Sequence, residues 1–334
     1  MMSLCTTSGY PYDVIGPYYS DANYNDAKLL DDIVEKEHEL MEFIGESKES
    51  VFVLDRGFRD CKDKLEDQNI AVMMPAFKEK SKQLNTPDAN ESRLVTKLRW
   101  KVEAYHGRLK TTWPFLKFQI SNHLVPVLPL CVKICTAALN AFRAYPCQYH
   151  EEEEQEALKM LDNASRMENS LSLRVLNDKG PLTPRNKRNW TPMDSAAGTP
   201  IADDFPALSL VQLRQITFGP YQLERAKYYA KEHLNESGDF RFDLCKVERG
   251  LLRCQIQSRH SNALKYNLAV KYNSQSIIEY CCSCTPGQRT VGCCSHVATI
   301  LWFLGYGRHK PEEMLRGRKH SLGTNIKTVK KGRI

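Results

Sequence analysis

Short apolar runs alternate with amphipathic stretches through residues 1–150 of the chain. VFVLDRG (51–57) has the pattern of a buried strand that ends in a tight turn, and IAVMMPAF (70–77) has that of a second strand. Between residues 91 and 110, apolar side chains recur at steps of three and four, which predicts an amphipathic helix. This order of strand, helix, strand and helix predicts an α/β layer built on βαβ units.

The pattern changes after residue 150. An acidic run is followed by a stretch rich in Ser, Asn, Asp, Thr and Pro, so we predict a flexible linker over 151–206. A second compact region follows, with a helix at 221–234, a pair of strands and a short helix at 296–305. We therefore expect an N-terminal domain (1–150), the linker, a small α+β domain (207–307) and a tail (308–334).

Composition and hydropathy indicate a soluble globular protein, with 42% hydrophobic and 26% charged residues. The N-terminus lacks the charged and apolar regions of a signal peptide. The most apolar stretch, 123–142, contains Lys133 and prolines at 126 and 129, so we expect it to fall short of a membrane span. We expect an intracellular chain with reduced cysteines, and neither a membrane nor a small-molecule substrate among its partners.

The net charge of +7 lies in the tail, where nine Lys/Arg face two Glu between residues 308 and 334. Such a basic tail suggests a polyanionic partner, nucleic acid first, or a nuclear import signal. RNKR (185–188) is a second candidate for import. Solvated, partner-free basic segments explain both stretches as well, and charge alone does not separate these alternatives.

The stretch YCCSCTPGQRTVGCCSH (280–296) holds five of the twelve cysteines. In a strand, Cys282 and Cys284 point to one face, while Cys294 and His296 stand at the start of the predicted short helix. Three thiolates and one imidazole form a closed tetrahedral set, which is typical of structural Zn²⁺. The neighbouring Cys281 and Cys293 point the other way in an extended chain, and either one is an alternative ligand.

The order CxC, CxH and an outgoing helix resembles the SWIM-type zinc finger over residues 265–305. SWIM modules occur in transposase-related and other nuclear proteins. The resemblance therefore implies binding to DNA or protein rather than catalysis.

Two acidic residues are candidates for chemistry in the N-terminal domain. Asp55 ends a buried strand, where open α/β sheets place their active sites, and Gly57 allows the chain to turn there. Glu103 fits the apolar stripe of its helix better than the basic face, and an acid that faces inward needs a partner or a metal. A turn cap at Asp55 and a salt bridge at Glu103 are the alternatives for each residue alone.

These two stretches together resemble the second and third acidic positions of DDE-type transposases of the Harbinger-related group, which have an RNase H-like fold. GYPYDVIGPYYSDANYNDAKLL (9–30) resembles the strand and turn before them, with Asn25-Asp26-Ala27 opening a helix. In this family, three carboxylates hold two divalent ions that cleave a phosphodiester. The chain begins too late for the strand that carries the first carboxylate, because Asp13 and Asp26 match later elements. We expect a partial domain that lacks its first strand.

The sequence thus predicts a transposon-derived, zinc-binding nuclear protein that associates with DNA or chromatin and is catalytically inactive. Asp55 and Glu103 would be vestigial ligands, with Mg²⁺ or Mn²⁺ needed only if the acidic site works. Two alternatives stay open: an active divalent-metal-dependent endonuclease or transposase, and an adaptor in which zinc stabilises a surface for protein partners.

Overall fold

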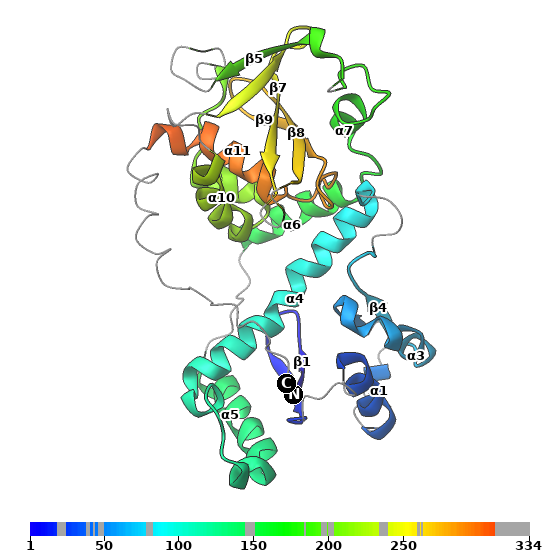
Figure 1. Cartoon of the computed structure of the whole chain (residues 1–334). Helices are drawn as coiled ribbons and strands as arrows, with labels where there is room; N and C mark the ends of the chain where they lie inside the picture. Colours follow the sequence, from blue (N-terminus) through cyan, green and yellow to red (C-terminus); the bar gives the residue numbers. More distant parts are fainter. Residues whose placement is uncertain are drawn as a thin grey trace, which may run out of the picture. The chain divides into compact units, whose positions relative to one another are not determined.

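The computed structural model of the chain (Figure 1) describes 13 stretches. They are residues 1–18, 25–37, 41–42, 44–45, 50–77, 83–143, 151–183, 185–194, 199, 204–233, 240–258, 261 and 263–310. The chain divides into two compact units, which are described separately. Unit 1 comprises Met1–Phe77 and Glu91–Ala157, and unit 2 comprises Lys78–Asn90 and Leu158–Ile334. The basic tail from residue 311 onward lies outside the described residues.

Unit 1 begins with an antiparallel hairpin of β1 (Met2–Cys5) and β2 (Pro11–Ile15), followed by α1 (Asp26–Lys36). Asn25 caps α1, because its side-chain oxygen accepts a hydrogen bond from the backbone N–H of Lys28 at 2.9 Å. The predicted strand and the helix opened by Asn25-Asp26-Ala27 are confirmed.

The next part of unit 1 is a parallel strand pair, β3 (Val51–Val53) and β4 (Ala71–Met73). Between them the chain forms η1 (Arg56–Cys61) and α3 (Lys62–Asp67). A parallel pair needs such a crossover, and the predicted strand–helix–strand order is confirmed. Buried side chains from α1, α3 and the strand ends form the core of this part, including Leu30, Val34, Cys61, Leu65 and Ile70.

A long helix, α4 (Thr86–Thr112), begins in unit 2 and continues through unit 1. In unit 1 its last turns pack Tyr105 and Leu109 against α5 (Leu128–Phe142) and β2. The hydroxyls of Tyr105 and Thr136 share a 2.6 Å hydrogen bond inside this core. The short turns η2 (Pro114–Leu116) and η3 (Asn122–Val127) connect α4 to α5.

The helical run Asn122–Phe142 corrects the expectation about the apolar stretch. Its 21 residues are long and apolar enough to cross a membrane by length and composition, with 22% of the apolar window buried. The two prolines do not break the run, because Pro126 lies in η3 and Pro129 in the first turn of α5, where no helical N–H is needed. The buried part, which includes Val132, Cys135 and Leu139, belongs to the core of unit 1.

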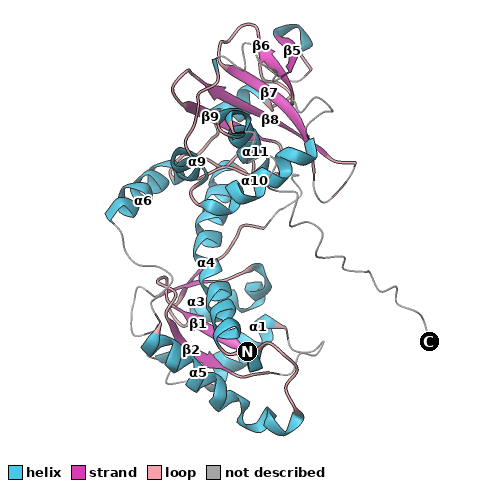
Figure 2. Cartoon of the chain, turned by 90° about the vertical axis from the view of Figure 1, so that its left-hand side faces the viewer, coloured by secondary structure: helices cyan, strands magenta, loops and turns pink. Residues whose placement is uncertain are grey.

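Unit 2 contains one antiparallel sheet of five strands in sequential order. The strands are β5 (Trp190–Asp194), β6 (Arg241–Cys245), β7 (Leu251–Gln257), β8 (Lys265–Tyr272) and β9 (Ile277–Cys282). Figure 2 shows them as a single twisted sheet, with helices against it. The predicted strand pair is thus the centre of a larger sheet.

The inner face of this sheet carries the main core of unit 2. Alternate residues of β7 and β8, such as Leu252, Ile256 and Leu268, are buried under three helices. These are α9 (Leu210–Thr217), α10 (Pro220–His233) and α11 (Ser295–Gly305), and the short turn η5 (Gly307–His309) follows. The helices predicted at 221–234 and 296–305 correspond to α10 and α11.

The segment predicted as a flexible linker, 151–206, differs from that expectation. It contains α6 (Glu151–Ala164), α7 (Ser170–Val175), η4 (Lys187–Asn189) and the edge strand β5. The cause is burial on the outer face of the sheet, where Leu171, Val175 and Trp190 pack against Leu251 and its neighbours. A few widely spaced apolar residues among polar ones are enough for this contact, and they produce no clear periodic signal.

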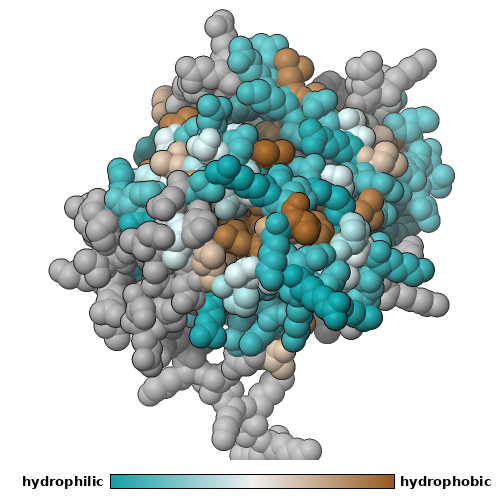
Figure 3. All heavy atoms as spheres, turned by 90° about the horizontal axis from the view of Figure 1, so that it is seen from above, coloured by the Kyte–Doolittle hydropathy of each residue, from teal (hydrophilic) through white to brown (hydrophobic). Residues whose placement is uncertain are grey.

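The face drawn in Figure 3 is mostly hydrophilic, with small separate hydrophobic patches.

The packing of α11 predicts a large cost for truncating its core side chains. Leu301 is fully buried, so Leu301→Ala is expected to lower the free energy of unfolding by about 2–5 kcal/mol. Leu173 on α7 is 44% exposed, and Leu173→Ala is the matched control, with a change of about 0.5 kcal/mol or less. Urea unfolding followed by circular dichroism measures both, and equal effects would contradict this core assignment.

Candidate metal centre and acidic pair

Three thiols and one imidazole converge where the end of β9 meets the start of α11. The Sγ atoms of Cys282, Cys284 and Cys294 and a ring nitrogen of His296 all lie within 4.8 Å of one another. The three cysteines are buried and the histidine is half-buried. We call these four residues the Cys/His cluster. It is the one group of three or more potential ligands that we find in the part of the chain the structure describes.

The spacing of the cluster fits a tetrahedral zinc ion. The Nδ1 atom of His296 lies 3.7 Å from Sγ of Cys282 and 3.8 Å from Sγ of Cys294. Zinc–sulfur bonds of about 2.3 Å and zinc–nitrogen bonds of about 2.0 Å place tetrahedral S and N ligands about 3.6 Å apart. The donor set and its separations are therefore compatible with a closed structural site, in which His296 would bind through Nδ1.

Local sequence explains why the four side chains meet. Cys282 ends β9, and a tight turn follows in which Cys284 O accepts from the N–H of Gly287 at 2.9 Å. The carbonyl oxygen of Gly287 also accepts a hydrogen bond from the N–H of Cys282 at 3.0 Å. Cys294 is the N-cap of α11, so the first turn of that helix carries His296 back over the strand end.

Backbone N–H groups already point at the sulfur atoms. The N–H of Cys284 lies 3.5 Å from Sγ of Cys282, and the N–H of Val297 lies 3.5 Å from Sγ of Cys294. Such donors stabilise thiolates and orient them towards a metal. The rings of Tyr266 and Tyr229 pack beside the His296 imidazole, with centroids 4.7 and 5.5 Å away. They hold the ring and shield part of it from solvent.

The protonation of the cluster is uneven. Burial raises the pKa of Cys282 well above its usual value, because a thiolate inside the protein loses its solvation. Burial acts in the same direction on Cys294, but hydrogen bonds from Cys282, Cys284 and His296 outweigh it, and the pKa of Cys294 falls well below its usual value. These directions favour a thiolate at Cys294, and a divalent cation bound here would supply the charge that also deprotonates Cys282 and Cys284.

The adjacent cysteines do not join the cluster. Cys281 points to the outer face of the sheet, where it packs with Val175, Trp190 and Leu251. Burial raises the pKa of its thiol, as expected for an unreactive cysteine. Cys293 is buried in the main core and lies outside the set of converging ligand atoms.

A segment from the N-terminal half of the chain supports the cluster, and the sequence analysis missed it. Gln83 donates its side-chain amide to the carbonyl oxygens of Cys282 at 2.6 Å and Cys284 at 2.9 Å. The N–H of Leu84 bonds the carbonyl of Thr285 at 3.0 Å. These contacts join residues some 200 positions apart in sequence, so no local pattern announces them.

Asn90, near the start of α4, supports a second turn of the cluster. Its side chain is buried, and its oxygen accepts from the N–H groups of Thr290 at 2.8 Å and Val291 at 3.1 Å. Its amide nitrogen donates to the Thr290 hydroxyl at 2.9 Å and to the carbonyl of Asn163 at 3.2 Å. All hydrogen-bonding groups of the buried amide are therefore satisfied, which fixes the turn that precedes Cys294.

The two predicted acidic residues lie close together in unit 1, but a cation stands between them. Asp55 caps η1 by accepting from the N–H of Gly57 at 2.6 Å. Its other oxygen accepts from Arg99 at 3.0 Å, and the same guanidinium reaches Glu103 at 3.3 Å. Arg99 thus bridges both carboxylates. The turn cap and the salt bridge considered as alternatives for these residues are both present.

Glu103 does not face the core, which corrects the assignment of this residue to the apolar stripe. Its side chain is 70% exposed, whereas Tyr105 and Leu109 are buried. The helix is exposed at Glu103, because only its last turns, after this residue, pack against α5 and β2. The carboxylate of Asp26 lies near Gly57 but completes no three-ligand group among the described residues.

Comparison with known proteins supports part of this picture. Residues 2–140 match the family model described as DDE superfamily endonuclease, which covers less than half of the chain. This match supports a transposase-derived domain in the N-terminal part, and the mixed α/β structure is consistent with it. The superfamily implies dependence on divalent metal. No curated protein and no solved structure matches the chain.

Gly287 is the residue whose substitution tests the turn of the metal centre. A Cβ atom there would lie 2.0 Å from the carbonyl oxygen of Cys282, so Gly287→Ala must displace the strand end. We expect a loss of about 1–3 kcal/mol in unfolding free energy, as for other overpacked sites, together with weaker metal retention.

Gly107→Ala is the control for this substitution. A Cβ atom at Gly107 meets nothing within 4 Å, and alanine favours the helix there by up to about 1 kcal/mol. Thermal unfolding and bound-metal analysis report on both variants. A Gly287→Ala protein as stable as the wild type would refute the tight packing of the turn.

Proposed function

We propose that this chain is a transposon-derived zinc protein that associates with nucleic acid and has lost endonuclease activity. The observation that carries the proposal is the convergence of Cys282, Cys284, Cys294 and His296 within 4.8 Å, in a chain whose residues 2–140 match the DDE superfamily endonucleases. Within this proposal, we assign unit 1 to the Harbinger-related transposases and residues 265–305 to the SWIM-type zinc fingers.

Zinc has a structural role in this proposal. All four positions of a tetrahedral site are filled by protein groups, so no position stays open for a water or a substrate. The ion would join β9 to α11, the helix that contributes the most buried residues to the core of unit 2. Its binding energy is then folding energy for the unit.

Loss of nuclease activity is supported by the contacts of the acidic pair. Two-metal phosphodiester cleavage needs carboxylates that are free to bind both ions and to neutralise the developing charge. Arg99 bonds both Asp55 and Glu103, and a metal at this place would have to displace its guanidinium. A third acidic ligand does not converge on the pair within the described ranges.

An active endonuclease is the second candidate function, and the family match favours it. In this case Asp55 and Glu103 would bind Mg²⁺ or Mn²⁺, and Arg99 would move to contact the phosphate. The ion would activate water or a 3′ hydroxyl and stabilise the leaving oxygen. An adaptor that uses zinc only to shape a protein-binding surface is the third candidate.

We place the protein in the nucleus, at DNA or chromatin. The net charge of +7 and the concentration of basic residues after position 307 support a polyanionic partner. RNKR (185–188) stays a second candidate for import, because all four residues are exposed and Arg185 makes only an exposed ion pair with Asp178 at 3.2 Å.

Metal content tests the zinc assignment directly. The purified protein is expected to hold one Zn²⁺ per chain, and Cys294→Ala is expected to lose most of it because three ligands close the site poorly. Cys281→Ala is the matched control, since that thiol faces the opposite side of the sheet. If Cys294→Ala retained zinc and Cys281→Ala lost it, Cys281 would take the place of Cys294 as the ligand.

Nicking of supercoiled plasmid in Mg²⁺ or Mn²⁺ separates the inactive protein from an endonuclease. We expect no nicking by the zinc-loaded protein and the same background from Glu103→Gln. The control variant removes one carboxylate charge at an exposed position, so the fold should persist. Nicking by the wild type that disappears in Glu103→Gln would establish catalysis and overturn the proposed inactivity.

A further inference from the structure

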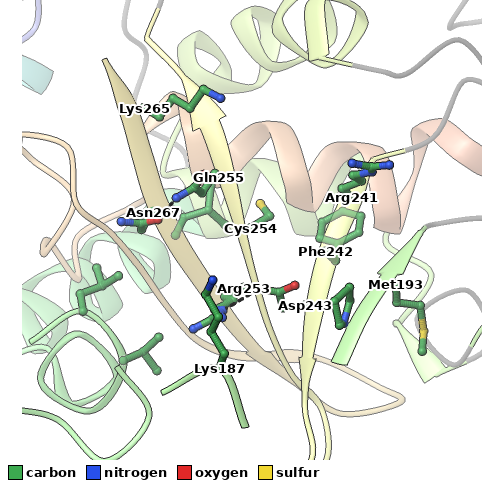
Figure 4. Close-up of a pocket in the computed structure, with 14 residues that line it drawn as sticks. Lys187, Met193, Arg241, Phe242, Asp243, Arg253, Cys254, Gln255, Lys265 and Asn267 are labelled. Atoms are coloured by element: carbon green, nitrogen blue, oxygen red, sulfur yellow. Dashed lines mark hydrogen bonds and ion pairs between the residues drawn. The ribbon is translucent and has the colours of Figure 1, made fainter. Parts of the chain in front are cut away.

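The outer face of the unit 2 sheet contains a polar hollow. Along β6, β7 and β8, residues alternate between the buried inner face and this outer face. One end of the outer face is covered by α7 and Trp190, and the rest borders a cavity of about 850 Å³ (Figure 4). We call it the outer-face hollow. Its polar lining is Lys187, Arg241, Asp243, Arg253, Gln255, Lys265 and Asn267.

The charge of the hollow is strongly positive. Four cationic side chains line it, from η4 and from all three central strands, and the single carboxylate of Asp243 leaves a net charge of +3. Lys187, Arg241 and Lys265 are exposed. Figure 4 shows Lys265 and Arg241 towards opposite sides of the hollow, with Arg253 and Lys187 between them. A recess with charges of one sign attracts an extended polyanion rather than a single ion.

Arg253 is the fixed member of this set. Its Nε donates to Asp243 at 2.8 Å, and its guanidinium stacks over the Trp190 ring at 4.2 Å. The Nη1 atom is buried without a hydrogen-bond partner among the described residues. The side chain as a whole keeps 13% of its surface exposed, and a guanidinium edge that solvent reaches is a good match for a phosphate oxygen.

We propose that the outer-face hollow binds the phosphate backbone of a nucleic-acid strand. Arg253 is the anchored contact, and Lys187, Arg241 and Lys265 hold neighbouring phosphates. Phe242 in the lining and Trp190 under Arg253 are 2% and 3% exposed, so they offer no ring on which a base can stack. Binding is therefore independent of base sequence. This inference rests on the proposed association with nucleic acid and assigns it a surface.

Salt dependence of binding tests the proposal on the full-length, zinc-loaded protein. The probes are fluorescent dT20 and a mixed-sequence single-stranded DNA 20-mer, titrated by anisotropy at several NaCl concentrations. The wild type is expected to bind both alike. In Arg241→Glu/Lys265→Glu, two phosphate contacts are lost, so the slope of log K against log[salt] should fall by roughly 1.4 and affinity roughly tenfold.

The matched control is Arg214→Glu/Arg225→Glu. Both arginines are exposed, on α9 and α10, and the change in net charge is the same. These helices cover the inner face of the sheet, so the control should keep a slope close to that of the wild type apart from a small general charge effect. Unchanged thermal unfolding and zinc content confirm that both variants are folded.

The outcomes separate this inference from the function on which it rests. Binding by the wild type with equal slopes for the two double variants overturns the hollow as the binding surface and leaves nucleic-acid association standing. A marked preference for one probe overturns the backbone-only contact. A wild type that binds neither probe at low salt overturns the proposed association itself, and the hollow with it.

Discussion

The structure of unit 2 depends on one closure, the meeting of the end of β9 with the first turn of α11. Two ligand side chains from the end of β9 and the turn after it meet two from the start of α11, and the three cysteines among them belong to the main core cluster of unit 2. Without a cation, the low dielectric of the interior disfavours more than one thiolate in this space. A metal would reverse that preference, so the packing of the core and the chemistry of the cluster are coupled.

The support of this closure by Gln83 and Asn90 has a wider consequence for the chain. Both side chains satisfy backbone groups of the cluster turns, and Asn90 lies within the first two turns of α4. The same helix carries Arg99 and Glu103 further along. Order at the Cys/His cluster therefore favours helical structure at the start of α4, because helix formation propagates from a fixed first turn.

Charged side chains have opposite roles at the acidic pair of unit 1 and in the outer-face hollow of unit 2. In unit 1, Arg99 neutralises two exposed carboxylates, and each of these ion pairs contributes little to stability because solvent screens it. In unit 2, Arg253 is largely buried and is held by Asp243 and Trp190. A guanidinium fixed in this way needs no reordering to bind an anion, and its cationic neighbours leave the recess with an excess of positive charge.

The sequence by itself determined the local elements and the four side chains that converge at the Cys/His cluster. Periodicity predicted β3, β4, α4, α10 and α11, and the CxC and CxH spacing predicted which four side chains meet, since strand and helix geometry fix near neighbours. Only the tertiary structure decided that Glu103 is exposed, that residues 170–194 cover and extend the sheet, and that Gln83 and Asn90 hold the cluster turns. These features depend on contacts between residues far apart in the chain, and the exposure of a side chain is set by what packs against its helix rather than by its own neighbours in sequence.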